Sequence, residues 1–190
     1  MRIKFKDAKD MFLHFGGSKY FMARQDLLEK YQQYNISEET EKKWLKEYVE
    51  DLYNQLDIKK NQTVISLLNV IRRYNYIGYI DKILFFMKSH VDNISNQYYM
   101  SLYAQYIFNL VIELSIMNRN KKLEFPLNLR VSCINTAALF NNRAKKMKLV
   151  EGFQISNFAQ FADGLTQQQY VLRKIKSLNA QINLARILEV

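Results

Sequence analysis

Glycine and proline are scarce in this chain: its 190 residues include five glycines and one proline. An all-β or α/β fold of this length normally needs many more of both residues for its turns and crossovers. Apolar residues make up 48% of the chain and charged residues 24%, which is typical of a globular protein rather than a disordered one. The composition therefore predicts an all-α fold whose helices are joined by short connections.

Cysteine and histidine are also scarce, which limits the chemistry that the chain can perform. Cys133 is the only cysteine, so it cannot form an intramolecular disulfide, and a reducing compartment is expected. His14 and His90 are the only histidines, and neither lies in a helical spacing that binds zinc or a di-iron pair. The sequence therefore predicts no metal, no cofactor and no catalytic residue, and it favours a protein that is not an enzyme.

The first residues do not resemble a secretion signal, because Asp7, Lys9 and Asp10 interrupt any apolar run. The longest apolar stretch, residues 98–117, has the length needed to cross a bilayer, but Glu113 would then lie in hydrocarbon at high cost. We interpret this stretch as the buried central helix of a bundle. The resulting predictions are a soluble protein, cytoplasmic localisation and no membrane span.

Apolar residues recur every three or four positions over most of the chain, which is the period of an amphipathic helix. The pattern predicts seven to eight helices in a single domain over residues 1–190, arranged as a bundle or an irregular array. Ser18 is expected to begin a second helix that runs to about Tyr34, and Ser37 a third. Pro126 fits the first turn of the seventh helix.

The last helix has the strongest start signal. Thr166 and Gln169 have the spacing of a capping box, in which each side chain bonds the backbone N–H of the other residue. An apolar stripe close to a heptad pattern follows: Val171, Ile175, Leu178, Ile182 and Ala185. With a short helix expected around residues 158–162, this segment has the outline of a helix-turn-helix, in which Gln168 and Arg173 would face bases. Two packed helices joined by a tight turn explain the same residues and are favoured.

Three isolated features have structural interpretations that we favour over functional ones. Residues 16–19, Gly-Gly-Ser-Lys, resemble part of a phosphate loop but follow a helix, so they are interpreted as a helix stop. Cys133 lies in an apolar stretch and is expected to be a buried, inert thiol. Glu113 lies among apolar residues and is expected to form an ion pair with Arg72 or Arg73.

Positive charge exceeds negative charge, and the excess lies towards the C-terminus. The net charge is +10; residues 1–95 hold 16 basic and 13 acidic side chains, whereas residues 96–190 hold 12 and 5. Residues 118–148 include eight basic side chains and one acidic side chain, Glu124. Such a bias is typical of a surface that binds nucleic acid or another acidic partner. The candidate contact residues are Arg119, Lys121, Lys122, Arg130, Arg143, Lys145, Lys146, Lys148, Arg173, Lys174 and Lys176.

The favoured function is that of a non-enzymatic helical protein-interaction or regulatory accessory protein, from an A/T-rich bacterium or its mobile elements. Its partner is expected to be another protein, and a second copy of the chain is a further candidate. The alternative is a basic nucleic-acid-binding regulator that uses residues 118–148 and the helix after Thr166. A/T-rich codons also favour lysine, so base composition competes as an explanation of the charge. A contiguous basic face would favour nucleic acid, and scattered lysines would not.

Overall fold

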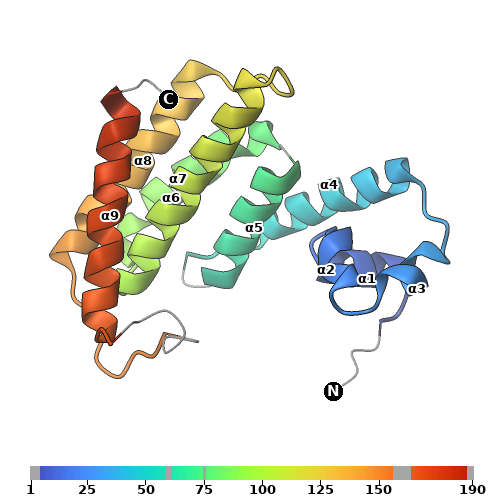
Figure 1. Ribbon diagram of the computed structural model, residues 1–190, viewed down its shortest axis with the longest axis horizontal. Helices are drawn as coiled ribbons and strands as arrows, with labels where there is room; N and C mark the ends of the chain where they lie inside the picture. Colours follow the sequence, from blue (N-terminus) through green and yellow to red (C-terminus); the bar gives the residue numbers. More distant parts are fainter. Residues whose placement is uncertain (1–4, 59–60, 75, 156–163, 188–190) are drawn as a thin grey trace. The chain divides into compact units, whose positions relative to one another are not determined.

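The computed structural model describes residues 5–58, 61–74, 76–155 and 164–187, and it is 74% helical (Figure 1). Within these residues the chain forms nine α-helices and two 3-10 helices and no strand. The predicted all-α fold is therefore confirmed, with one α-helix more than the seven to eight expected. The chain divides into two compact units, an N-terminal unit Met1–Leu56 and a C-terminal unit Asp57–Val190.

The N-terminal unit contains four helices, and polar side chains cap three of them. The helices are α1 (Ala8–His14), α2 (Lys19–Ala23), α3 (Leu28–Gln32) and α4 (Glu38–Asn54). The side chains of Asp7, Ser18 and Ser37 accept hydrogen bonds from the first turns of α1, α2 and α4. The predicted starts at Ser18 and Ser37 are therefore confirmed. After α1, the backbone of Gly16 and Gly17 adopts positive φ, which confirms the helix stop.

The second helix expected from Ser18 to about Tyr34 is wrong, because the chain forms two short helices there. Asp26 adopts φ of 55° and ends α2, with the N–H of Leu27 donating to the Met22 carbonyl at 2.9 Å. Aspartate tolerates this left-handed conformation better than most residues, but an aspartate within a helical pattern does not by itself predict that the helix ends there. Periodicity therefore merged α2 and α3 into one helix.

The core of the N-terminal unit is built around aromatic rings from three helices. Phe12 of α1 stacks on Tyr31 of α3, with ring centroids 5.6 Å apart, and lies 6.0 Å from the ring of Trp44 on α4. Met11 and Val49 are fully buried beside them. These contacts join α4 to α1 and α3, which at 7 and 5 residues are too short to be stable alone.

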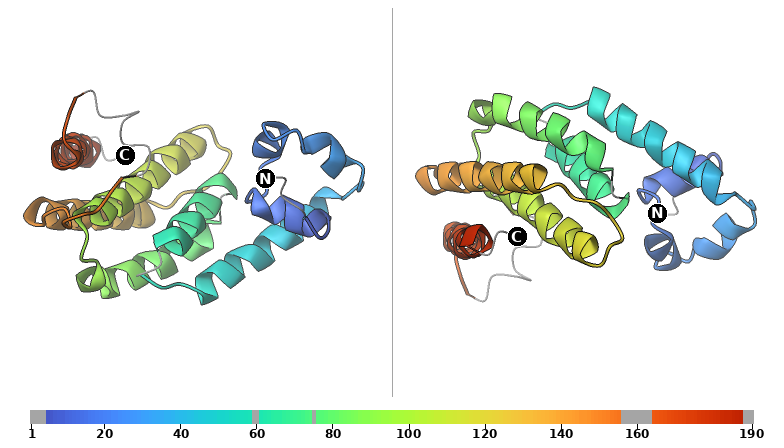
Figure 2. Two further views of the ribbon diagram at one scale, coloured as in Figure 1. Left: turned by 90° about the horizontal axis from the view of Figure 1, so that it is seen from below. Right: turned by 90° about the horizontal axis from the view of Figure 1, so that it is seen from above.

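The C-terminal unit contains five α-helices and two short 3-10 turns. In order they are α5 (Asn61–Tyr74), η1 (Ile77–Tyr79), α6 (Ile80–Ser89), η2 (Val91–Asn93), α7 (Gln97–Arg119), α8 (Leu127–Lys146) and α9 (Gln167–Ile187). Figure 2 shows α9 on the opposite side of the α7–α8 pair from α5 and α6. Helix α7 packs against α5, α8 and α9, so it lies at the centre of this unit.

Helix α7 corresponds to the apolar stretch that was expected to be buried. Tyr103 and Leu110 are fully buried, whereas Ile116 is 51% exposed and Tyr106 only partly buried. The helix is long and apolar enough to cross a membrane, and 56% of the relevant window is buried inside the protein. Packing against three other helices accounts for its apolar character.

The start of α9 and its buried stripe agree with the sequence. The Thr166 N–H donates to Gln169 Oε1 at 2.8 Å, and the Gln169 N–H donates to Thr166 Oγ1 at 3.2 Å, so the predicted capping box is confirmed. The five residues of the predicted stripe are the buried residues of this helix: Val171, Ile175, Leu178, Ile182 and Ala185. The opposite side of α9 is therefore available for contacts with a partner.

Candidate acidic-partner surface on α8 and α9

Helices α8 and α9 contain no acidic residue. Their 20 and 21 residues include eight basic residues: Arg130, Arg143, Lys145, Lys146, Arg173, Lys174, Lys176 and Arg186. The whole net charge of the protein also lies in the C-terminal unit, which has 18 basic and 8 acidic residues, whereas the N-terminal unit has 10 of each. The helix pair is therefore the centre of a strongly basic unit.

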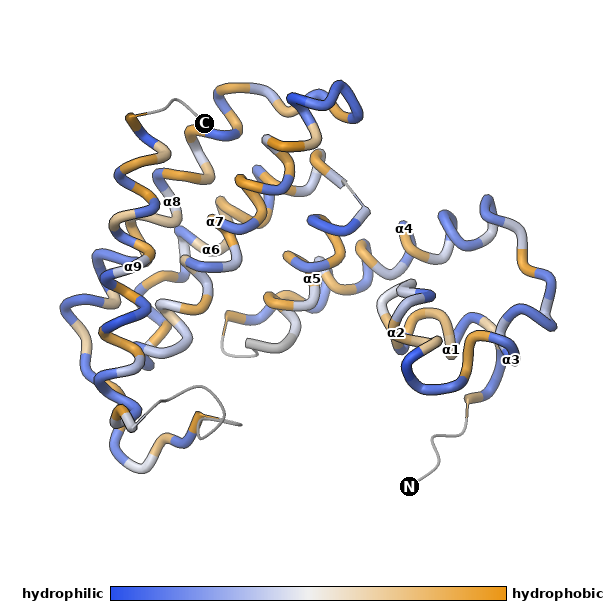
Figure 3. Tube along the Cα trace, viewed as in Figure 1, coloured by the Kyte–Doolittle hydropathy of each residue, from blue (hydrophilic) through white to orange (hydrophobic). Residues whose placement is uncertain are grey.

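The basic residues of 118–148 do not form one cluster. Arg119, Lys121 and Lys122 lie just before α8, in and beside the hydrophilic loop drawn in blue in Figure 3. Arg143 and Lys146 lie in the last turn of α8. At about 1.5 Å per residue, the 20 residues of α8 separate the two groups by about 30 Å. The sequence bias at 118–148 therefore divides into two groups at opposite ends of one helix.

The first half of α9 brings further basic residues to the C-terminal end of α8, because the two helices run antiparallel (Figure 1). The Asn141 side-chain amide donates to the Ile175 carbonyl at 3.2 Å, and Lys145 Nζ donates to Asn179 Oδ1 at 2.6 Å. At this end the exposed basic residues are Arg143, Lys145, Lys146, Lys148, Arg173, Lys174 and Lys176. Seven of the eleven candidate residues are thus gathered at one end of the helix pair.

Three members of the candidate set have environments that differ from those of the other exposed cations. Arg130 is half-buried, and its Nε is buried without a hydrogen-bond partner, so this side chain is less accessible than the lysines. Arg143 forms an ion pair with Asp92 of η2, which neutralises part of its charge. Lys174 Nζ lies 4.9 Å from the ring centroid of Tyr170, in the range of a cation–π contact.

Two cations on the outer side of the α8–α9 pair are held by amide oxygens. Lys145 Nζ donates to Asn179 Oδ1 at 2.6 Å and lies 3.4 Å from Asn142 Oδ1, and Arg186 donates to Asn135 Oδ1 at 3.0 Å. We call these five residues the amide seam. In the described part of the chain, neither cation has a carboxylate within 4.0 Å. The seam therefore orders its cations without neutralising them.

A buried amide network anchors the end of α8 to the starts of α7 and α9. Gln97 is fully buried, and its Nε2 donates to the carbonyls of Ala144 at 2.9 Å and Met147 at 2.8 Å. Gln168 Nε2 donates to Gln97 Oε1 at 2.9 Å, and Gln168 Oε1 accepts from the Leu149 N–H at 3.2 Å. The network supplies a donor to the Met147 carbonyl at the end of α8 and a second donor to the Ala144 carbonyl, which also accepts from the Met147 N–H at 3.2 Å. Single buried glutamines break no periodicity, so no sequence pattern indicates this network.

The helix-turn-helix outline fits the structure poorly. Residues 158–162 of the expected first helix lie outside the described residues. Gln168 was expected to face bases. Instead, its side-chain oxygen accepts from the Leu149 N–H and its side-chain nitrogen donates to Gln97, so both atoms form hydrogen bonds within the protein. Gln167 is similarly engaged, because its Oε1 accepts from the Ile155 N–H at 3.0 Å. These glutamines therefore stabilise the turn before α9 rather than face outward.

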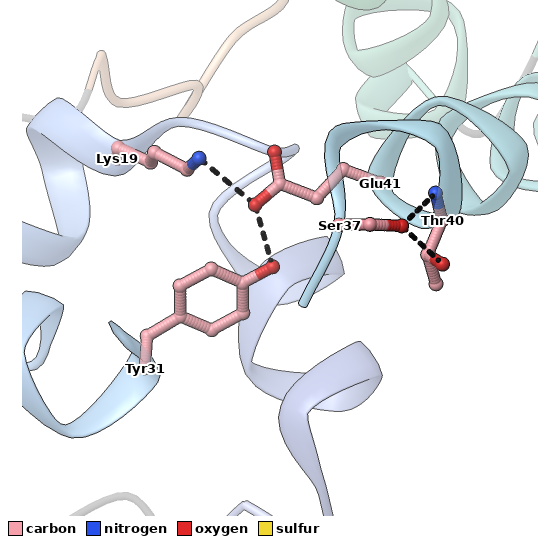
Figure 4. Close-up of polar contacts among 5 residues, drawn as sticks. All are labelled: Lys19, Tyr31, Ser37, Thr40 and Glu41. Carbon is pink, nitrogen blue, oxygen red and sulfur yellow. Dashed lines mark hydrogen bonds and ion pairs between the residues drawn. The ribbon is translucent and has the colours of Figure 1, made fainter. Parts of the chain in front are cut away.

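Glu41 is the one strongly buried carboxylate among the described residues of the N-terminal unit, and its contacts have a structural role. Glu41 is 9% exposed, and its Oε1 accepts from Tyr31 Oη and Lys19 Nζ, both at 2.9 Å (Figure 4). Burial, followed by the hydrogen bond to Glu41, raises the pKa of Tyr31 above its ordinary value of 10.0. The contact joins α2, α3 and α4, which explains the role of Glu41 without invoking catalysis.

The remaining sequence features have the expected structural roles. Arg72 forms an ion pair with Glu113 at 2.8 Å, although half of the Glu113 side chain is exposed rather than buried. Cys133 is fully buried, and burial raises the pKa of its thiol to about 12, which makes it a poor nucleophile below that pH. His90 caps α6, where its Nδ1 lies 2.8 Å from the Phe86 carbonyl.

A hollow of about 300 Å³ lies in the C-terminal unit beside the start of α7. Its walls include Ile58, Ile94, Tyr99 and Phe153, and the Tyr99 phenol is the one ionisable group that lines it. This lining lacks the convergent acids and bases that hydrolytic or transfer chemistry needs. Among the described residues, no three His, Cys, Asp or Glu side chains are placed to hold a metal ion together.

Comparisons with known proteins identify no relative. No protein family, no curated protein and no solved structure matches this chain.

Proposed function

We propose that this chain is a non-enzymatic interaction protein, an accessory or regulatory factor whose C-terminal unit binds an acidic macromolecule. The observation that carries the proposal is the complete lack of acidic residues in α8 and α9, which together hold eight basic residues. A surface of one charge sign attracts and orients a partner of the opposite sign.

The lack of acids goes against what isolated helices favour. Negative side chains in the first turn stabilise a helix by about 0.3–1 kcal/mol through its dipole, and α4 has three of them: Glu38, Glu39 and Glu41. Neither α8 nor α9 has any. The dipole does favour the basic residues in the last turns of the two helices, Arg143, Lys145, Lys146 and Arg186. It does not explain the lack of acids, for which binding of an acidic partner is the better explanation.

An acidic protein surface is the first candidate partner. Apolar side chains lie among the basic ones on α8 and α9: Val131 and Leu139 are 45% and 41% exposed, and Leu172 and Leu184 are 44% and 56% exposed. Interfaces between proteins combine apolar contacts with arginine in this way. A second copy of the chain suits this surface less well, because like charges would face each other.

Nucleic acid is the second candidate partner, and the charge of the C-terminal unit favours it. That unit has 18 basic and 8 acidic residues. The group at the end of α8 and the first half of α9 forms the largest collection of candidate residues, whereas the group before α8 lies about 30 Å away. A nucleic acid would therefore contact the end group first.

A matched pair of charge reversals tests the proposal. The test variant carries Lys145→Glu, Lys146→Glu and Lys148→Glu, and the control variant carries Lys42→Glu, Lys43→Glu and Lys46→Glu on α4. All six lysines are exposed, so both variants should fold and both change the net charge equally. Fluorescence anisotropy with labelled poly-glutamate and labelled duplex DNA should show weaker binding of the test variant only. Equal losses in both variants, or no binding of either probe at low salt, would contradict the proposal.

A further inference from the structure

The amide seam presents mainly hydrogen-bond donors. The oxygens of Asn135 and Asn179 already accept from Arg186 and Lys145, so these amides have their N–H groups left to offer. The ammonium of Lys145 and the guanidinium of Arg186 are donors only. Phosphate and carboxylate oxygens are acceptors only, so either anion matches these donors. The chemistry of the seam therefore suits an anionic group rather than a neutral polar one.

The cations of the seam are ordered before any partner binds. A free lysine or arginine side chain loses about 2 kcal/mol of conformational entropy when it is fixed. The hydrogen bonds of Lys145 and Arg186 to asparagine restrict these side chains within the free protein. Part of the entropic cost of binding is thus removed in advance, while the full positive charge remains.

The spacing of the two cations suits a repeating phosphate chain. Asn135, which holds Arg186, and Lys145 are ten residues apart on α8, which corresponds to about 15 Å. Duplex DNA carries one phosphate charge per about 1.7 Å of helix axis, so a duplex that lies along α8 offers phosphates near both positions. Carboxylates on a protein surface have no such regular repeat, which favours phosphate as the group that both cations bind.

From these contacts we infer that the amide seam binds the phosphodiester backbone of nucleic acid, independently of base sequence. Lys145 and Arg186 each neutralise one phosphate, and Asn135, Asn142 and Asn179 are positioning residues that hold the two cations. This inference rests on the proposed binding of an acidic macromolecule, and it chooses phosphate over carboxylate as the group bound.

The salt dependence of duplex binding tests the inference. Each phosphate contact releases counterions and contributes about −0.9 to the slope of log affinity against log salt. The full-length variant Lys145→Gln/Arg186→Gln should therefore have a slope smaller in magnitude by about 1.8 than the unaltered chain. The control Lys42→Gln/Lys43→Gln, at two exposed positions on α4, should leave the slope unchanged. Circular dichroism checks that each variant is folded, and if the double variant unfolds, each single variant should reduce the slope by about 0.9.

The possible results separate the inference from the proposed function. A reduced slope in the seam variant alone, equal for duplexes of unrelated sequence, supports the inference. An unchanged slope in the seam variant overturns it, even if the chain binds DNA elsewhere. Binding to poly-glutamate without binding to duplex or single-stranded DNA overturns the phosphate assignment and leaves the proposed function standing. Binding to neither probe at low salt overturns both.

Discussion

The cations of the N-terminal ion pairs and those of the amide seam are held by different chemical groups. In the N-terminal unit, Lys9 contacts Glu47 at 2.6 Å and Lys19 contacts Glu41 at 2.9 Å, so carboxylates neutralise these lysines. On the α8–α9 pair, Lys145 contacts an asparagine instead, at 2.6 Å. An amide oxygen fixes a cation's position without cancelling its charge. The composition differs in the same direction: the N-terminal unit has equal numbers of basic and acidic residues, and the C-terminal unit carries the whole net charge of +10.

Because of this difference, the surface cations of α8 and α9 should affect association with a partner more than they affect folding stability. Exposed ion pairs contribute about 0–1 kcal/mol, so replacing carboxylates by amides on α8 and α9 costs little stability. The uncancelled charge has a large effect on association, because long-range attraction acts before contact. The comparison predicts that apolar packing stabilises the C-terminal unit, and that its surface cations can be changed without unfolding it.

Truncating the buried centre of α7 should have the largest effect. Leu110 is fully buried, and its replacement by alanine should lower the free energy of unfolding by about 2–5 kcal/mol. Urea denaturation followed by circular dichroism measures this loss. Ile116→Ala on the same helix is the control, because that side chain is 51% exposed and should cost about 0.5 kcal/mol or less. Tyr106 is only partly buried, so its truncation should cost less than that of Leu110.

The single tryptophan, Trp44, lies in the N-terminal unit and allows the two units to be followed separately. The expectation of a single domain remains a prediction. It implies that Leu110→Ala shifts the Trp44 fluorescence transition in urea together with the circular dichroism transition. A shift of the dichroism alone would mean that the units unfold independently.

Removing the Tyr31 hydroxyl should have the next largest effect. Its hydrogen bond to Glu41 is buried and involves a carboxylate, and such bonds contribute about 1.5–3 kcal/mol, so Tyr31→Phe should lower stability by this amount. The pKa of Tyr31 is raised in the folded chain, so its contribution is complete below pH 10.0 and is lost as the pH rises further. The stability of the Phe variant should lack this dependence on pH. Urea denaturation followed by Trp44 fluorescence, at pH 8 and above pH 10, measures the free energy of unfolding of both chains. A variant as stable as the unaltered chain at pH 8 would contradict the role of Glu41.

Breaking the neutral amide network should have a slightly smaller effect. Gln97→Leu removes the side-chain donor to the Met147 carbonyl and one of two donors to the Ala144 carbonyl, and an unpaired buried polar group costs about 1–3 kcal/mol. The loss should be independent of salt, because no charged group takes part. A salt-dependent loss, measured by urea denaturation at low and high ionic strength, would show that the stability of this unit depends on charge.

Helix identity and the buried stripes followed from the sequence because each depends on local patterns. Thr166 and Gln169 lie three residues apart in the chain, and the stripe of α9 repeats every three or four residues. The pairing of Arg72 with Glu113 was also predicted, since few other partners exist for an acid in an apolar stretch. The split into α2 and α3 was not predicted, because it depends on one left-handed residue, Asp26.

The candidate surface was predicted only in part. Sequence proximity grouped Lys121 with Lys145, but the length of α8 separates them, and a charge count along the chain ignores this distance. The amide seam joins Asn135 to Arg186, which are 51 positions apart. Such contacts depend on how two helices pack, so no local pattern indicates them.

Lysine footprinting tests the difference between the units most directly, because one experiment reports on both. The full-length chain is acetylated at low salt with and without an excess of duplex DNA or poly-glutamate, and each lysine is quantified by mass spectrometry. The account predicts that the acidic probe protects Lys145, Lys146 and Lys176, while Lys42 and Lys43 react equally with and without it. Equal protection of the lysines on α4 and α8, or no protection at either, would contradict the assignment of binding to the acid-free helix pair.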